Sequence, residues 1–396
     1  MSTSITQPKT GSGWILLALA IGAFGIGTTE FSPMGLLPVI AEGVNVSIPT
    51  AGLLVSAYAI GVMIGAPIMT LIFSRFGKRA ALMSLMAIFT VGNIMSALSP
   101  DYWTLLVARL VTSLNHGAFF GLGAVVAASV VPKEKQASAV ATMFMGLTIA
   151  NIGGVPAATW LGQQIGWRMA FAGTAVLGVI AIAALWIALP QGERGQRPDV
   201  KKELSVLIRS EVLIAMGTTV LGSAALFGVY TYVAPILQEL TQVTESYVTA
   251  MLVLIGIGFT AGNWLGGKLA DWSLDGATII FLSGAALVTF IMPLVIGTQV
   301  GAAISLLVWG AVAFAMVPPV QTRVMLAASE APGLASSINV GAFNFGNAVG
   351  AAVGGWVIHA GLGYGMVPVA AGLLAAGGVL LVLIGRQRRS SDAVFA

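Results

Sequence analysis

The sequence predicts an all-α integral membrane protein whose twelve transmembrane helices form two pseudo-symmetric six-helix bundles. Of the 396 residues, 57% are hydrophobic and only 8% are charged, and the mean hydropathy is +0.96. Because a soluble domain carries about 25% charged residues, this composition indicates a protein that lies in a lipid bilayer. Its apolar runs are long and continuous, whereas the strands of a β-barrel alternate between apolar and polar residues, so the runs indicate helices.

Twelve apolar runs have the length that a membrane-spanning helix requires, and each is bounded by polar or Gly/Pro turns. They cover residues 14–40, 50–73, 79–98, 103–131, 136–161, 168–189, 211–237, 246–270, 277–297, 300–327, 333–358 and 363–385. Several exceed the about 20 residues needed to cross the hydrocarbon core, which indicates that these helices tilt or extend beyond it.

The Lys and Arg residues predict the orientation of these helices. If both termini lie in the cytoplasm, 16 of the 18 basic residues fall in cytoplasmic segments. The two exceptions are Arg109, inside the fourth run, and Arg168, on the outer side. Cytoplasmic loops of membrane proteins carry an excess of Lys and Arg, so we expect a multi-pass protein with both termini in the cytoplasm.

One long polar segment divides the chain. Residues 190–210 are rich in charged side chains and separate six apolar runs from six others. We therefore predict an N-terminal bundle over residues 1–189, a cytoplasmic linker over 190–210 and a C-terminal bundle over 211–396. A short surface helix is expected over residues 201–208 of the linker.

The two halves carry the marks of an internal repeat. Three residues of the fifth run recur 196 positions later in the eleventh run: Asn151, Gly154 and Trp160 become Asn347, Gly350 and Trp356. The loops after the second and eighth runs align at nearly the same offset, with Ser74 opposite Asp271. Each marker alone is open to chance similarity, but their agreement indicates duplicated halves, as many transporters have.

Glu30 is the acidic residue that lies deepest within an apolar run. An ionised group buried without a partner is costly, so ionisable residues inside the membrane are candidates for function. Pro33 and nearby glycines loosen the helix beside it. We interpret Glu30 as a proton-binding acid in a transport pathway. The alternative is an acid that reaches the headgroups or is neutralised by a neighbouring polar side chain.

Arg109 and His116 of the fourth run are the candidates for interaction with Glu30. With a helix rise of about 1.5 Å per residue, Glu30 lies roughly 15 Å below the outer surface, Arg109 roughly 9 Å and His116 roughly 20 Å. Arg109 would favour the carboxylate, whereas apolar burial favours the neutral acid. His116 is a candidate proton relay or substrate ligand, and a packing role beside Gly117 is equally open.

Polar and aromatic residues within the runs are candidates for a substrate cavity, because small-molecule sites are apolar with a few polar anchors. These candidates are Asn115, Phe119, Asn151, Tyr230, Tyr232, Trp309, Gln321, Asn339, Phe343 and Asn344. For each single asparagine, a hydrogen bond that joins two helices is the favoured interpretation. For the set, we expect some members to line the cavity.

Other classes of function are disfavoured by what the sequence lacks. It has two histidines, no cysteine, no paired carboxylates within the runs and no phosphate-binding Gly-Lys-Ser/Thr loop. We therefore expect no enzyme activity, no metal and no cofactor, with the proton gradient as the driving force. The isoelectric point near 9.5 reflects basic residues in short loops, so no nucleic-acid partner is expected.

Four motifs carry a resemblance to a known family. They are Thr28-Thr29-Glu30-Phe31 with Gly35-Leu36-Leu37-Pro38, Arg109 with His116-Gly117-Ala118-Phe119-Phe120, Gly146 through Gly154-Val155-Pro156, and Arg75-Phe76-Gly77-Lys78-Arg79. Along its whole length the chain resembles the drug:proton antiporter branch of the major facilitator superfamily, in particular sugar-efflux and arabinose-efflux-permease-like proteins. The loop motif departs from the family pattern, because Ser74 replaces an aspartate and Thr70 replaces a glycine.

The resemblance implies a monomeric exporter of drugs or sugars in a bacterial inner membrane, in which Glu30 exchanges a proton for substrate and Arg109 modulates it. It also implies a role in alternating access for the residues that match the loop and fifth-helix motifs: Arg75, Gly77, Lys78, Arg79, Gly154, Pro156, Gly267 and Asp271. Proton symport or facilitated uptake remains an alternative function. A non-transporting membrane receptor is a third alternative, although neither a buried acid nor repeated halves are needed for it.

Overall fold

The computed structural model describes residues 11–73, 75–132, 136–190, 209–328 and 332–395, and its regular elements are helices. The first half of the chain forms α1 (Ser12–Gly43), α2 (Ile48–Phe73), α3 (Lys78–Ala97), α4 (Tyr102–Ser113), α5 (His116–Ser129), α6 (Gln136–Ile149), η2 (Ala150–Gly154), α7 (Val155–Ile165) and α8 (Trp167–Ala188). The second half forms α10 (Ser210–Thr231), α11 (Val233–Ile236), η3 (Leu237–Thr241), α12 (Glu245–Trp272), α13 (Leu274–Val295), α14 (Gln299–Ala315), α15 (Val317–Ala327), α16 (Pro332–His359) and α17 (Met366–Phe395). The π-helical segments are η2 and η3.

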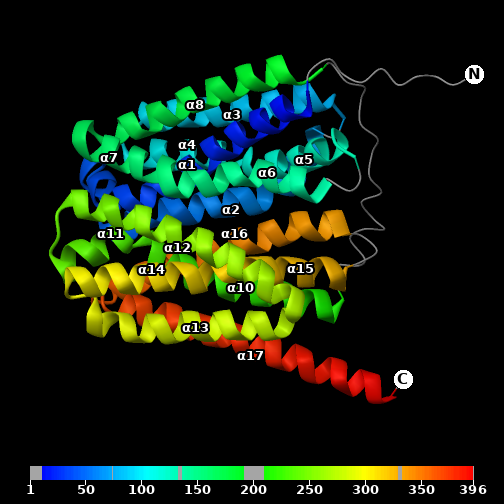
Figure 1. Cartoon of the computed structure of the whole chain (residues 1–396). Helices are drawn as coiled ribbons and strands as arrows, with labels where there is room; N and C mark the ends of the chain where they lie inside the picture. The colour runs from blue at the N-terminus through cyan, green and yellow to red at the C-terminus, as the bar shows by residue number, and fades with distance from the viewer. Residues whose placement is uncertain (1–10, 74, 133–135, 191–208, 329–331, 396) are drawn as a thin grey trace, which may run out of the picture.

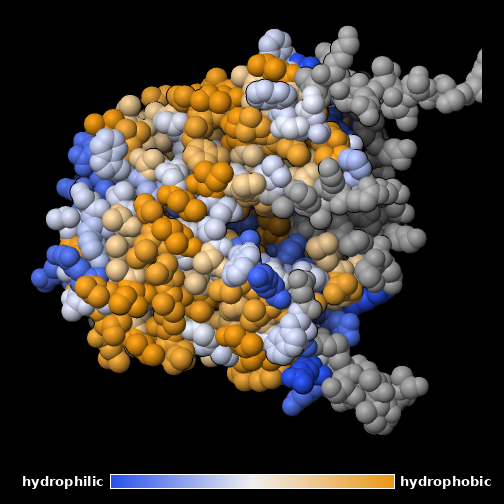
Figure 2. Space-filling view, in the orientation of Figure 1, coloured by the Kyte–Doolittle hydropathy of each residue, from blue (hydrophilic) through white to orange (hydrophobic). Residues whose placement is uncertain are grey.

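The helices run nearly parallel to one another, with α1 to α8 on one side of the molecule and α10 to α17 on the other (Figure 1). Within the described residues, eleven spans are long and apolar enough to cross a membrane. The remaining expected span is α16, whose three asparagines lower its hydropathy. Hydrophobic residues cover much of the visible surface along the helices (Figure 2). The expected all-helical membrane fold is therefore confirmed.

The internal repeat is visible in the packing. Gly154 lies against Phe24 and Thr28 of α1, the first helix of the first half. Gly350 lies against Ala224 and Gly228 of α10, the first helix of the second half. The repeated tryptophans Trp160 and Trp356 are both exposed, and Asn151 and Asn347 are both buried. Residues related by the 196-position offset thus have equivalent surroundings.

Several spans are interrupted where the sequence suggested continuous helices. The seventh breaks at Tyr232, the tenth breaks at Met316 and the fifth contains η2. A proline follows each break or lies beside it, and proline removes the N–H that the carbonyl four residues earlier would accept. The fourth span also breaks, at Leu114 and Asn115, without a proline.

Most of the described basic residues gather at one end of the helix bundle, here called the basic end, toward which α17 runs in Figure 1. At this end Lys78 donates to Ser129 Oγ (3.3 Å) and Arg79 lies over the ring of Trp186. At the opposite end both the Nε and Nη2 atoms of Arg168 donate to the Ser99 carbonyl. Some predicted features fall outside the described residues: the surface helix over 201–208, most of the 190–210 linker and Ser74.

Candidate functional site

Glu30 lies in the middle of α1 and is only 6% exposed. One of its carboxylate oxygens, Oε2, is 3.9 Å from His116 Nδ1. His116 begins α5, directly after the break in the fourth span, and it is as deeply buried as Glu30. The structure therefore brings together an acid and an imidazole that lie on different helices, at a distance slightly longer than a hydrogen bond.

Arg109 of α4 is almost fully buried and makes a different contact from the one that its charge suggests. Its Nη1 atom donates to the backbone carbonyl of Thr29 at 2.9 Å. Pro33 lies four residues after Thr29 and has no N–H, so this carbonyl has no helical donor and is free to accept from arginine. Across the described residues, Arg109 forms no ion pair with Glu30, and its Nε and Nη2 atoms have no hydrogen-bond partner.

Tyr58 of α2 is a site residue that the sequence analysis missed. The Arg109 guanidinium lies 4.2 Å from the centre of its ring, which is a cation–π arrangement. The Tyr58 hydroxyl is 3.1 Å from His116 Nδ1. The only signal in the sequence was that Tyr58 is the one titratable residue of the second apolar run.

Asn93 of α3 is a second residue that was missed. Its Oδ1 atom accepts from the hydroxyls of Thr29 (2.6 Å) and Thr174 (3.1 Å), and its Nδ2 atom donates to the Phe89 carbonyl. Asn93 thereby joins α1, α3 and α8 beside the carbonyl that holds Arg109. A buried polar network whose members all have partners fixes the relative rotation of these helices.

An aromatic cluster lies next to Glu30 along α1 and connects the two halves. Phe31 contacts Phe227 and Tyr230 of α10, with ring centroids 5.9 and 5.8 Å apart. Tyr230 in turn contacts Trp309, and Phe227 contacts Phe343. Of the predicted cavity residues, Tyr230, Trp309 and Phe343 therefore gather at the centre of the molecule, where they are packed against one another.

The other predicted cavity residues lie apart from this cluster. Phe119 packs on Gly22 within the first half, and Tyr232 donates to the Ala351 carbonyl at 2.7 Å. Asn339 donates to Gln321 and accepts from Thr219, so these residues join α10, α15 and α16. The remaining asparagines, Asn115, Asn151 and Asn344, are buried with at least one amide atom that has no partner within the described residues.

Two seams join the halves. At one seam, α2 meets α16, where Ser56 Oγ donates to the Ala348 carbonyl at 3.2 Å. At the other, α7 and η2 meet α12, where Thr249 Oγ1 donates to Gln163 Oε1 at 2.8 Å. The α12 backbone approaches η2 closely, since a Cβ added to Gly256 would lie 2.5 Å from the Asn151 carbonyl oxygen. Both hydrogen bonds lie toward the end opposite the basic end.

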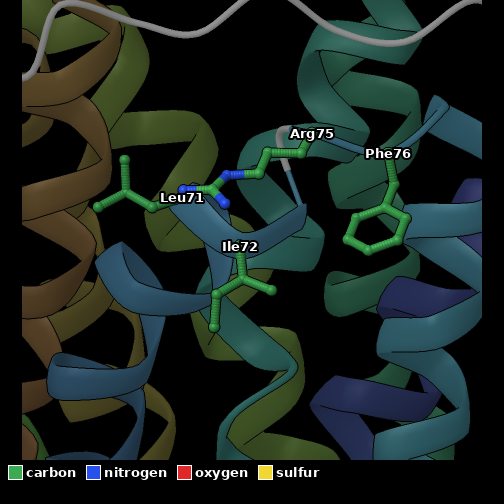
Figure 3. A pocket seen from close by; sticks show the side chains of 4 residues that line it. All are labelled: Leu71, Ile72, Arg75 and Phe76. Carbon is green, nitrogen blue, oxygen red and sulfur yellow. The ribbon is translucent and has the colours of Figure 1, made fainter.

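The predicted conformational residues lie at the basic end and along the second seam. Arg75 lines a hollow of about 530 Å³ with Leu71, Ile72 and Phe76, and Figure 3 shows Arg75 and Phe76 pointing in different directions. Gly77 precedes α3, which begins with Lys78 and Arg79. Gly154 and Pro156 lie at the η2–α7 junction, and Gly267 lies in α12 with open space around it. Asp271 also lies in α12, but its side chain is outside the described residues.

A second hollow of about 670 Å³ lies at the basic end of the second half. Its walls include Glu211, Trp272 and Arg386, together with an ion pair in which Arg323 Nη1 is 2.8 Å from Asp275 Oδ1. Among the described residues, no group of three or more His, Asp or Glu side chains is placed to hold a metal ion.

With this geometry in view, comparison with known proteins decides the family. The model of the Major Facilitator Superfamily matches residues 19–339. The chain belongs to the major facilitator superfamily. It is 64% identical over 374 residues to the inner membrane transport protein YdhP of Escherichia coli (strain K12), which covers 94% of this chain and 96% of that protein. It is 30% identical over 372 residues to a probable sugar efflux transporter of Helicobacter pylori (strain G27), covering 91% and 93%.

The fold agrees with that of a solved transporter structure. The crystal structure of a D-xylose-proton symporter matches with a TM-score of 0.74 and 18% identity, covering 94% of this chain and 97% of that one. The resemblance to the superfamily suggested by the sequence motifs is thus confirmed. The protein is a multi-pass membrane transporter of small molecules and is not an enzyme.

Proposed function

We propose that this transporter is a proton-coupled antiporter that exports small molecules such as drugs or sugars across the bacterial inner membrane by alternating access. The observation that carries the proposal is the position of Glu30, which is buried in the first span, within 4 Å of His116 and adjacent in sequence to Phe31. A carboxyl group in this position can gain or lose a proton, and its charge would be felt by a substrate among the aromatic rings.

In this proposal the two halves, 1–189 and 211–396, rock about the central aromatic cluster, and the 190–210 linker and both termini lie in the cytoplasm. The gathering of basic residues at one end supports this orientation. The seams then hold the outer half closed, and export requires that the hydrogen bonds Ser56–Ala348 and Thr249–Gln163 break. The protein is proposed to act as a monomer, without a cofactor and with no nucleic-acid partner.

The substrate class rests on two kinds of support. The Helicobacter pylori relative is named a probable sugar efflux transporter. Independently, the cluster of Phe31, Tyr230 and Trp309 beside a carboxyl group would suit an aromatic or cationic drug, because aromatic faces attract cations. Ethidium and radiolabelled arabinose are therefore suitable probes for the two classes.

Purified protein in proteoliposomes tests the proposal with these probes and imposed pH gradients of either sign. An antiporter accumulates the probe when the vesicle interior is acidic, because protons leave as the probe enters. Accumulation driven by an acidic exterior would contradict antiport and indicate symport. Equilibration that ignores both gradients would indicate facilitated diffusion, and binding of a probe without any flux would indicate a receptor.

A further inference from the structure

Tyr58 occupies the space between two functional groups of the fourth span. Arg109 lies in α4 and His116 begins α5, so they stand on either side of the break in the fourth span. The Tyr58 ring covers the Arg109 guanidinium, and its hydroxyl reaches His116 Nδ1 at 3.1 Å. The same Nδ1 atom is 3.9 Å from Glu30 Oε2. Tyr58 and Glu30 therefore compete for one nitrogen atom, and Tyr58 is the closer of the two.

The direction of the Tyr58–His116 hydrogen bond follows from the available acceptors. Among the described residues, the Tyr58 hydroxyl has no hydrogen-bond partner other than His116 Nδ1. If Nδ1 carried a proton, the phenol oxygen would accept a hydrogen bond from Nδ1–H. The buried phenol hydrogen would then have no acceptor, which is costly. The phenol therefore donates to Nδ1, and neutral His116 carries its proton on Nε2.

We propose that Tyr58 is a positioning residue that holds the Nδ1 lone pair of His116 and so keeps the proton of the pair on Glu30. This inference rests on the proposed role of Glu30 as the proton-binding acid. Transfer within the pair breaks the O–H bond of the Glu30 carboxyl group and forms an N–H bond at Nδ1, giving a carboxylate and an imidazolium. For this to occur, the hydrogen bond from the Tyr58 hydroxyl to Nδ1 breaks, and the Glu30 and His116 side chains approach to hydrogen-bond distance. The phenol oxygen then becomes an acceptor.

No other titratable group of the packed helices competes for Tyr58. Helix α1 contributes Glu30, α4 contributes Arg109 and α5 contributes His116. The other titratable residues of α1 and α4 are Glu42, in the last turn of α1, and Tyr102, the first residue of α4. Helix α16 also packs against α2, but its one titratable residue is His359 at its last position. Within α2 itself, Tyr58 is the only titratable residue. A change in the Tyr58 hydroxyl should therefore act through this group of four residues.

Infrared spectroscopy of the purified full-length protein tests the proposal without any substrate. The C=O stretch of a protonated carboxyl group is followed against pH, and the band of Glu30 is the one that Glu30→Gln removes. In Tyr58→Phe the ring still covers Arg109, but Nδ1 is free to take the proton. The pH at which the Glu30 band has half its full intensity should then be about one unit lower than in the wild type, which is the shift expected for the loss of one hydrogen bond.

The matched comparison removes the imidazole. In a His116→Gln background, Tyr58→Phe should leave the Glu30 band where His116→Gln alone puts it. Tyr232→Phe also removes a buried hydroxyl that makes a hydrogen bond, to the Ala351 carbonyl, and it should not move the band. A fluorotyrosine at position 58, which is a stronger donor, should move the band to higher pH and gives a second test if Tyr58→Phe does not fold.

No shift in Tyr58→Phe, or an equal shift with and without His116, would overturn the role of Tyr58. A shift of the same size in Tyr232→Phe would also overturn it, because the effect would then not depend on Nδ1. The transport outcome is separate. If the proteoliposomes show no proton-coupled flux while the band shifts as described, the antiporter proposal fails and the positioning role of Tyr58 stands.

Discussion

Gly256→Ala should force open the seam between the two halves. The added Cβ would lie 2.5 Å from the Asn151 carbonyl oxygen and 2.8 Å from its carbonyl carbon, and both atoms belong to the backbone of η2. Neither can rotate away, so α12 and η2 must separate. Overpacking of this kind costs about 1–3 kcal/mol, and the lower part of that range applies where the two packed segments can move apart. The closed seam should therefore lose about 1–2 kcal/mol, which is a factor of about 5–30 in its population relative to the open state.

The natural sequence has no cysteine, so the seam can be measured by cross-linking without removing native thiols. Cysteines replacing Gln163 and Thr249 stand where the two side chains now form a hydrogen bond. Their rate of disulfide formation follows the fraction of closed molecules, so it should fall in the Gly256→Ala background, by up to about 5–30-fold under conditions in which the open state predominates. Gly153→Ala is the matched control, because it lies in η2 on the other side of the same seam and its Cβ would meet nothing within 4 Å. Equal cross-linking rates in the two backgrounds would refute the reasoning.

Three further predictions concern stability. Pro33→Ala and Pro38→Ala both remove a proline from inside α1, but only Pro33→Ala supplies an N–H that competes with Arg109 for the Thr29 carbonyl. In equilibrium unfolding in mixed micelles, Pro33→Ala should therefore be less stable than Pro38→Ala by about 1.5–3 kcal/mol. Equal stabilities of the two variants would contradict this. Asp275→Asn removes the carboxylate that lies 2.8 Å from Nη1 of buried Arg323 and should lower stability by about 1–3 kcal/mol, a range reduced because Asp275 is partly exposed. Glu211→Gln in the same hollow should have little effect. The backbone N–H of Thr104 donates to Asp101 and holds the pKa of Asp101 below its ordinary value of 3.8. The contribution of the Asp101 carboxylate to stability is therefore complete above the ordinary pKa and is lost as the pH falls through the lower pKa of the folded state. The stability of Asp101→Asn should depend less on pH between about pH 5 and pH 2 than that of the wild type, and an unchanged dependence would contradict this.

The fold could be predicted from the sequence because each span is a long apolar run. A helix that crosses the lipid bilayer requires a long continuous apolar run. The repeat then predicts how the runs are grouped, and the basic loops predict their orientation. The interruptions were less accessible. Pro235 explains why α10 ends at Thr231, but the break at Asn115 has no proline, and it depends on how α4 and α5 pack against their neighbours. That break places His116 beside Glu30.

The sequence analysis named Glu30, Arg109 and His116 as candidates but did not predict the contacts that they make. Helix rise gives depth, and it placed Glu30 roughly 15 Å below the outer surface, between Arg109 at roughly 9 Å and His116 at roughly 20 Å. Depth says nothing about rotation, and the pairing of Arg109 with the Thr29 carbonyl instead of Glu30 depends on rotation. The free carbonyl follows from Pro33, a signal that was in the sequence but that could be used only once the partner helix was known.

The cavity candidates show the limit of residue type as a guide. Tyr230, Trp309 and Phe343 do gather at the centre, whereas Asn339 and Gln321 are hydrogen-bonded to each other between helices of one half. An asparagine within an apolar run is expected in either place, because both burial in a helix interface and exposure to a cavity satisfy its amide. Only the structure separates the two.

The central claim is that Glu30 carries the proton that is exchanged for substrate. Its most direct test compares wild type with Glu30→Gln in proteoliposomes, using the probe that the wild type transports. Two fluxes are measured: accumulation driven by a pH gradient, and exchange of labelled for unlabelled probe at equal pH. We expect that Glu30→Gln loses the driven accumulation and keeps the exchange. Driven accumulation equal to that of wild type would contradict it.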